Sequence, residues 1–192
     1  MNTPSHTILN LAILRRSQRP ELTWPIIVGS LLPDAALFVF YGWARAIAQL
    51  PDRVIWDEAY YQPFWQDVFA IGNSIPLALG GLGIALWKKR PAWAALFVSM
   101  LLHHAEDLPL HNEDAHRHFF PLSNLRIVSP VSYWDPDHFG TYVALVEMVL
   151  VLGASVWLFR RVRSRLGRGL LIANGLFYLL AYSFFYLRVL ST

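Results

Sequence analysis

Long apolar runs separated by polar connections dominate the chain. Five of them are long enough to cross a membrane, and they cover residues 22–43, 67–87, 92–108, 141–159 and 170–190. A shorter run over residues 4–14 precedes them, and its helix would reach roughly 16 Å, about half of the hydrocarbon core of a bilayer. The pattern therefore predicts an all-α integral membrane helical bundle with about five transmembrane helices and an N-terminal half-helix, in a single membrane domain over residues 1–192.

The composition is typical of a membrane protein and excludes chemistry that depends on cysteine. The 192 residues are 55% hydrophobic and only 15% charged, with a mean hydropathy of +0.37, which is too apolar for an ordinary soluble domain. There is no cysteine, so disulfides, thiolate ligands and cysteine nucleophiles are excluded. The net charge of +3 gives no support for nucleic-acid binding, and we expect membrane lipids as the surrounding partners. The sequence does not determine an oligomeric state.

Basic residues gather in every second connection. Eleven of the 16 Lys and Arg residues lie at 15–19, 88–90 and 160–168, and acidic residues dominate the connections at 52–67 and 113–137. Connections rich in Lys and Arg remain on the cytoplasmic side of a membrane. We therefore expect the polar loop 109–140 on the non-cytoplasmic side, in a bacterial inner membrane or its equivalent.

Histidines and carboxylates crowd into that loop and the helix end before it. Six of the seven histidines lie between His103 and His138. His103 and Asp107 have i, i+4 spacing and His104 and Asp107 have i, i+3 spacing, so either His can share a helix face with the carboxylate. Imidazole and carboxylate are ligands for Zn, Mn or non-haem Fe. The cluster predicts a divalent metal site, with Zn or Mn expected; the alternative is a polar cap of solvated histidines.

Polar residues in the other apolar runs are expected at the same depth in the membrane as this cluster. His6 lies about a dozen residues before the basic turn at 15–19, and Asp34 lies about a dozen residues after the next apolar run begins. An antiparallel helix pair would place the two side by side. Asn73 and Glu147 fall in the same half of their runs. The predicted metal ligands are His6, Asp34, His103, His104, Asp107 and His111.

Several of these residues have a second interpretation. Asp34 follows Pro33 and could cap a helix broken at that proline, and His6 could be solvated. His111 and His116 could bind metal, or they could act as a general base and a contact for a substrate phosphate. Glu147 could orient a histidine ligand. The candidate catalytic residues are Asp107, His111 and His116.

The order of these motifs resembles a known family. Ser5-His6 is followed by LLPDAALF around Asp34, a polar pair in the next run, His103 and Asp107 at the end of a run, and a loop reaching FFPLS at residues 119–123. This order resembles the YdjM-like membrane-bound, metal-dependent hydrolases, which are distantly similar to zinc-dependent phospholipase C. The resemblance covers roughly residues 3–125. It implies metal ligation by His6, Asp34, His103 and Asp107.

Two positions depart from the family pattern. Ala36 stands where the family commonly has a second acid, and Asn73-Ser74 stands where it has a His-Ser pair. From the resemblance and the predicted location, we expect a metal-dependent hydrolase for an amphiphilic, lipid-like phosphoester or ester at the non-cytoplasmic interface. These departures favour the alternative, a non-catalytic metal-binding scaffold or assembly protein. A metal or proton transporter is a third reading, which the scarcity of ionisable residues in the cytoplasmic half opposes.

Overall fold

The computed structural model describes residues 1–184, and helices are the regular structure found in them. The eight α-helices are α1 (Thr3–Leu14), α2 (Thr23–Gly42), α3 (Asp52–Val54), α4 (Pro63–Gly72), α5 (Ile75–Trp87), α6 (Pro91–Asp107), α7 (Gly140–Phe159) and α8 (Arg165–Tyr182). Short 3-10 or π-helical turns are η1 (Pro20–Leu22), η2 (Trp43–Ile47), η3 (Ile55–Ala59) and η4 (Pro136–His138). The predicted all-α class is confirmed for this part of the chain.

Three helical segments are long and apolar enough to cross a membrane: Pro20–Ile47, Pro63–Trp87 and Gly140–Phe159. They contain the predicted first, second and fourth spans. The predicted third span is the 17-residue helix α6, and the described part of the fifth lies in α8, but neither belongs to this set. Residues 185–190 of the predicted fifth span lie outside the described residues.

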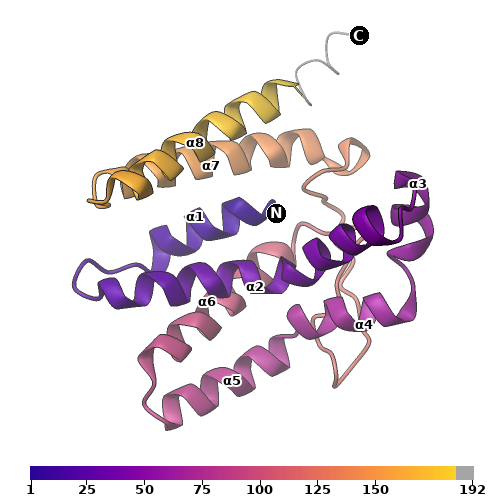
Figure 1. Ribbon diagram of the computed structural model, residues 1–192, viewed down its shortest axis with the longest axis horizontal. Helices are drawn as coiled ribbons and strands as arrows, with labels where there is room; N and C mark the ends of the chain where they lie inside the picture. The colour runs from indigo at the N-terminus through magenta and orange to yellow at the C-terminus, as the bar shows by residue number, and fades with distance from the viewer. Residues whose placement is uncertain (185–192) are drawn as a thin grey trace.

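The long helices lie side by side in one bundle (Figure 1). Helix α1 packs between α2 and α7, α6 packs on α2, α5 packs on α6, and α8 packs on α7. The α1–α2, α5–α6 and α7–α8 connections all lie at the left end of the bundle in Figure 1, and the coil that follows α6 lies toward the other end. The three basic stretches of the sequence therefore share one end of the molecule.

Polar side chains fill the interior and large apolar ones cover the outside. Ser5, His6 and Asn10 of α1 are fully buried, whereas Trp24 is 73% exposed and Trp87 is 76% exposed. This distribution reverses that of a soluble domain, which seldom exposes apolar patches of this extent. It is the arrangement expected when hydrocarbon surrounds the helices.

Small and polar residues hold the central helices together. A Cβ on Gly29 of α2 would lie 2.2 Å from the carbonyl oxygen of Leu96 in α6, so glycine is required for this close approach. Asn10 Nδ2 donates to Ser99 Oγ at 2.8 Å, and Ser99 Oγ donates to the Ile26 carbonyl at 2.7 Å. Such contacts replace the hydrophobic effect as the force that joins helices in a membrane.

The structure corrects three local expectations. Helix α2 continues through Pro33, so Asp34 is not the cap of a broken helix. The second predicted span divides into α4 and α5, and Ser74 caps α5 by accepting from the Leu77 amide at 3.1 Å. The sequence of residues 44–66 predicts a loop with an interfacial aromatic belt. In the structure these residues are largely helical, because their aromatic side chains pack in a core around buried Phe40.

Candidate metal centre

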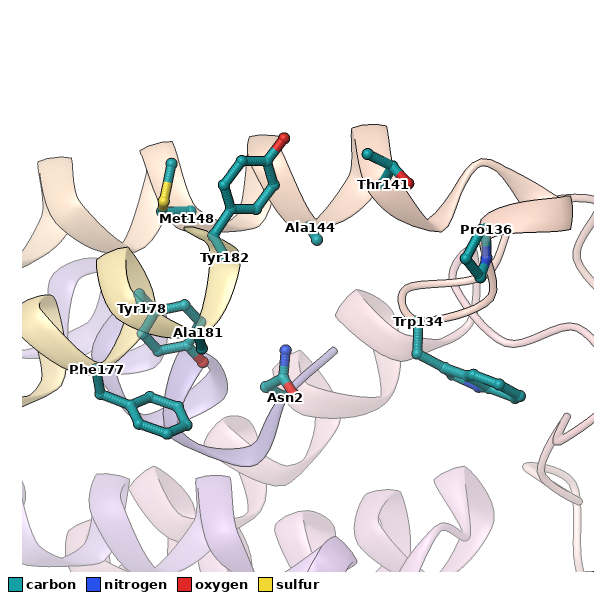
Figure 2. A pocket seen from close by; sticks show the side chains of 10 residues that line it. All are labelled: Asn2, Trp134, Pro136, Thr141, Ala144, Met148, Phe177, Tyr178, Ala181 and Tyr182. Carbon is teal, nitrogen blue, oxygen red and sulfur yellow. The ribbon is translucent and has the colours of Figure 1, made fainter. Parts of the chain in front are cut away.

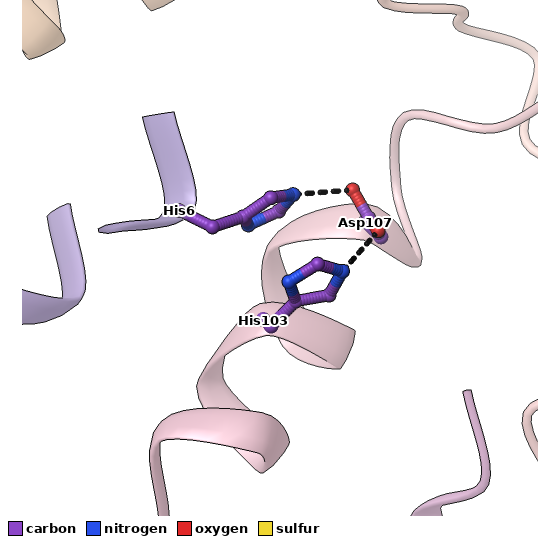
Figure 3. A group of neighbouring side chains, drawn as sticks. All are labelled: His6, His103 and Asp107. Carbon is purple, nitrogen blue, oxygen red and sulfur yellow. Dashed lines mark ion pairs between the residues drawn. The ribbon is translucent and has the colours of Figure 1, made fainter. Parts of the chain in front are cut away.

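Helices α1 and α6 bring together three buried metal-ligand groups (Figure 3). His6 comes from α1, and His103 and Asp107 face it from the last turn of α6. His6 Nε2 lies 3.1 Å from Asp107 Oδ1, and His103 Nε2 lies 3.0 Å from Asp107 Oδ2. Ligands that bind one Zn ion at about 2.0–2.2 Å lie roughly 3.0–3.5 Å from one another, so these atoms have the separation of a coordination shell.

The other ring nitrogen of each histidine is occupied by an acceptor. His6 Nδ1 lies 2.6 Å from Glu106 Oε2, and His103 Nδ1 lies 2.8 Å from the Ser30 carbonyl oxygen. These acceptors favour the proton on Nδ1, which leaves the Nε2 lone pair pointing at Asp107. Neither Nε2 has a hydrogen-bond partner among residues 1–184. Two lone pairs facing a buried carboxylate form a donor set that a metal ion can occupy.

A second group of donors shares Asp107. Asp107, His111 and His116 also present ligand atoms within 4.8 Å of one another. A turn after α6, closed by the Leu110 amide donating to the Asp107 carbonyl at 2.8 Å, returns His111 toward the helix end. His111 Nε2 lies 3.3 Å from Asp107 Oδ1, and its Nδ1 lies 3.0 Å from Asp114 Oδ2. His111 thus lies between two carboxylates, but unlike His6 and His103 it makes no hydrogen bond through Nδ1 within residues 1–184.

Burial and neighbouring charges set the protonation of the loop histidines. Burial, followed by the nearby His111, lowers the pKa of His116 to about 3, and burial also lowers the pKa of His118. Burial opposes protonation of His111 as well, but contacts with Asp107 and Asp114 outweigh it and raise the pKa of His111. Burial would raise the pKa of Asp114, yet its contact with His111 lowers it. The surrounding residues thus favour the protonated form of His111 and the neutral forms of His116 and His118.

The remaining predicted ligands lie at the edge of these groups. Asp34 Oδ1 is 3.6 Å from His103 Nε2, and Asp34 Oδ2 accepts from Thr3 Oγ1 at 2.6 Å, but Asp34 belongs to neither donor group. His104 is turned to the opposite side, where its Nε2 lies 3.2 Å from the Gly72 carbonyl oxygen. The sequence spacing left open which histidine pairs with Asp107, and the structure places His103 there.

Two contributors were not assigned from the sequence. The sequence predicts no role for Glu106, although it follows His103 by three residues and thus shares its helix face. The amino group of Met1 lies 2.5 Å from Asp107 Oδ1. No sequence signal identifies this contact, because it depends on how far α1 inserts between its neighbours.

The polar loop is anchored across the start of α5. His118 Nδ1 lies 3.0 Å from the Asn73 carbonyl oxygen, and the Ile75 amide donates to the His118 carbonyl at 2.9 Å. Ser74 Oγ donates to the Phe120 carbonyl, and Arg117 pairs with Asp67 at 2.6 Å. The break between α4 and α5 therefore positions the loop that carries His111 and His116.

Glu147 holds the start of α1 rather than a histidine. Its Oε1 accepts from the Asn2 amide at 3.0 Å and from Ser5 Oγ, and Tyr178 of α8 joins the same cluster. Beside it lies a cavity of about 420 Å³ between α7, α8 and the loop residues Trp134 and Pro136 (Figure 2). Trp134 Nε1 donates to Asp114 Oδ2 at 3.2 Å, so the cavity adjoins the second donor group.

Comparisons of the chain with protein-family models, with curated proteins and with solved structures give no match. The function is therefore inferred from the site itself.

Proposed function

We propose that the protein is a metal-dependent hydrolase that acts on an amphiphilic phosphoester or ester. The observation that supports it best is the set of three histidine Nε2 atoms facing the buried carboxylate of Asp107. The Nδ1 atoms of His6 and His103 have hydrogen-bond acceptors, and that of His111 lies 3.0 Å from Asp114 Oδ2. His6 and His103 converge with Asp107 in one donor group, and His111 and His116 converge with the same carboxylate in a second group.

In this proposal His6, His103 and Asp107 hold a divalent ion, Zn or Mn, with Asp34 beside them. The ion would supply Lewis-acid activation of water and of the scissile group. His111 moves the proton at Nε2, and Asp114 stabilises the protonated ring from the Nδ1 side. His116 remains neutral next to His111, with ring centroids 4.7 Å apart, and contacts the polar group of the substrate.

The surroundings of the site favour a lipid-like substrate. The cavity in Figure 2 is lined largely by apolar side chains from α7 and α8, such as Ala144, Met148 and Phe177. An acyl chain in this cavity would place its polar end near Trp134, whose indole contacts Asp114. The resemblance to the YdjM-like hydrolases and the placement of the basic connections suggest the same substrate class and a non-cytoplasmic position. The five-span topology, with α6 and α8 as further spans, is part of this proposal.

A non-catalytic metal-binding scaffold is the second candidate. Asn73 stands at a family ligand position, and its Nδ2 donates to the Phe69 carbonyl at 3.1 Å instead of facing the donors. Ala36 supplies no ligand. Because neither position supplies a ligand, fewer groups can bind a metal on the α2–α4 side of the centre.

One experiment separates the two candidates. Protein purified in detergent is assayed in mixed micelles against a panel of lipid phosphoesters and esters, with Zn or Mn added or chelated. The hydrolase proposal expects metal-dependent turnover that falls about 10²–10⁴-fold in His111→Gln while the metal content stays unchanged. Bound metal without turnover on any member of the panel would favour the scaffold, and the absence of bound metal would reject both.

A further inference from the structure

A second, larger cavity runs along the other side of α1. It has a volume of about 1280 Å³ and lies between α1 and α2 on one side and the end of α7 and α8 on the other. It extends from Thr3, at the start of α1, to Arg15, just after its end. Ile8, Leu11, Ile27 and Leu171 are among the apolar residues that line it. We call this cavity the α1 groove.

The length of the α1 groove corresponds to one leaflet of a bilayer. Helix α1 has 12 residues, so a groove along it is about 18 Å long. The hydrocarbon core of a bilayer is about 30 Å thick, so one leaflet supplies about 15 Å of acyl chain. The groove therefore has the depth of a lipid tail that enters from one face of the membrane.

Four arginines line the groove at one end. Arg15 belongs to the α1–α2 connection, and Arg160, Arg161 and Arg163 belong to the α7–α8 connection. These connections lie at the same end of the bundle (Figure 1). Over residues 1–184 none of the four forms an ion pair with a carboxylate; the nearby Glu21 is paired with Arg19. The mouth of the groove is thus a concentration of positive charge without a carboxylate partner in this part of the chain, and only Arg161 is held internally, by stacking on the Trp157 ring at 3.6 Å.

We propose that the α1 groove binds one anionic phospholipid of the leaflet at its arginine end. The phosphate lies among Arg15, Arg160 and Arg163, because guanidinium groups bind phosphate through paired hydrogen bonds. The acyl chains follow the apolar wall formed by Ile8 and Leu11 toward Thr3. The acyl chains of a zwitterionic lipid would fit the apolar wall equally well, but its headgroup carries no net negative charge to pair with the arginines. This proposal does not depend on hydrolase activity or on a bound metal.

The test compares two triple substitutions that remove equal charge from connections at the same end of the bundle. Arg160→Gln/Arg161→Gln/Arg163→Gln changes the groove, whereas Lys88→Gln/Lys89→Gln/Arg90→Gln changes the α5–α6 connection, which does not line it. Lipid binding to the full chain is measured by native mass spectrometry with phosphatidylglycerol and phosphatidylcholine. We expect the groove variant to lose the preference for phosphatidylglycerol by at least about tenfold, and the control variant to change by less than about twofold.

A third variant keeps the arginines and fills the groove. Leu11→Trp is expected to weaken binding of phosphatidylglycerol because its side chain occupies the tail path, and this result remains informative if the arginine variant does not fold. Equal loss in the two triple variants would mean diffuse attraction to the surface and would overturn the proposal. Displacement of the lipid by millimolar inorganic phosphate, or unchanged binding in Leu11→Trp, would overturn it as well.

Discussion

At the scale of single residues, Asp107 is the group on which the candidate centre depends. It is 1% exposed, and the Nε2 atoms of His6, His103 and His111 all lie within 3.3 Å of its two oxygens. A buried carboxylate is unfavourable unless charge and hydrogen bonds compensate it. The Met1 amino group compensates part of the charge of Asp107, and histidine rings that carry their hydrogen on Nδ1 present lone pairs that can bind a metal ion.

Glu106 offers a test of how the first histidine is oriented. Replacing Glu106 by Ala removes the acceptor 2.6 Å from His6 Nδ1, so the ring loses its fixed tautomer and orientation. Because groups that orient a ligand typically contribute 10–100-fold to metal affinity, we expect a loss of about that size, measured by competition with a chromogenic chelator. Glu113→Ala removes an exposed carboxylate of the same loop and should leave the affinity unchanged. Equal affinities for the two variants would contradict this role of Glu106.

At the scale of elements, the close approach of α2 and α6 positions the site. Ser30 of α2 accepts from His103, and Asp34 lies one turn further on. Gly29 permits this approach, since even a Cβ at that position would meet the Leu96 carbonyl. The hydrophobic pattern predicted that both segments are helices, but the glycine contact that fixes their separation has no signal in that pattern.

Gly29→Leu should therefore separate the two helices. We expect destabilisation of about 1–3 kcal/mol, the usual cost of overpacking, together with weaker metal binding because the His103 ring loses its carbonyl partner. Thermal unfolding in detergent and the metal content of the same sample measure both effects. Gly80→Leu is the matched control, because a Cβ at Gly80 meets nothing within 4 Å. If Gly29→Leu were as stable as Gly80→Leu, the packing account would be wrong.

The sequence anticipated which candidate ligands lie close together better than it anticipated the elements around them. Helical spacing placed His103 and Asp107 on one face, and counting residues from the basic turn brought His6 and Asp34 to the same depth. The choice between His103 and His104 could not be made from spacing, because it follows from the Ser30 and Gly72 carbonyls on either side of α6. The helical content of residues 44–66 was missed because their aromatic residues were assigned to an interfacial belt instead of a core around Phe40.

At the scale of the whole molecule, the placement of the basic residues predicts one orientation in a membrane. Three segments can cross a membrane by length and composition, and the basic connections share the end of the bundle opposite the coil that carries the histidines (Figure 1). Moving a cluster of Lys and Arg across a membrane is unfavourable, so that end is expected to face the cytoplasm.

The absence of cysteine allows a direct test of this orientation. A single cysteine is introduced at Gln18 in the α1–α2 connection or at Glu113 in the polar loop, both of which are exposed. In intact cells or spheroplasts, we expect a membrane-impermeant thiol reagent to label Glu113→Cys, and to label Gln18→Cys only after the membrane is permeabilised. The reverse pattern would invert the orientation and place the candidate centre nearer the cytoplasm.

The metal content of the detergent-purified protein tests the central claim most directly. Elemental analysis is performed on the wild type and on Asp107→Asn after exposure to Zn or Mn and removal of free metal. We predict near-stoichiometric metal in the wild type and its loss in Asp107→Asn, because Asp107 is the carboxylate of the donor group with His6 and His103. A wild type that binds no metal after reconstitution, or an Asp107→Asn variant that retains it, would contradict the account.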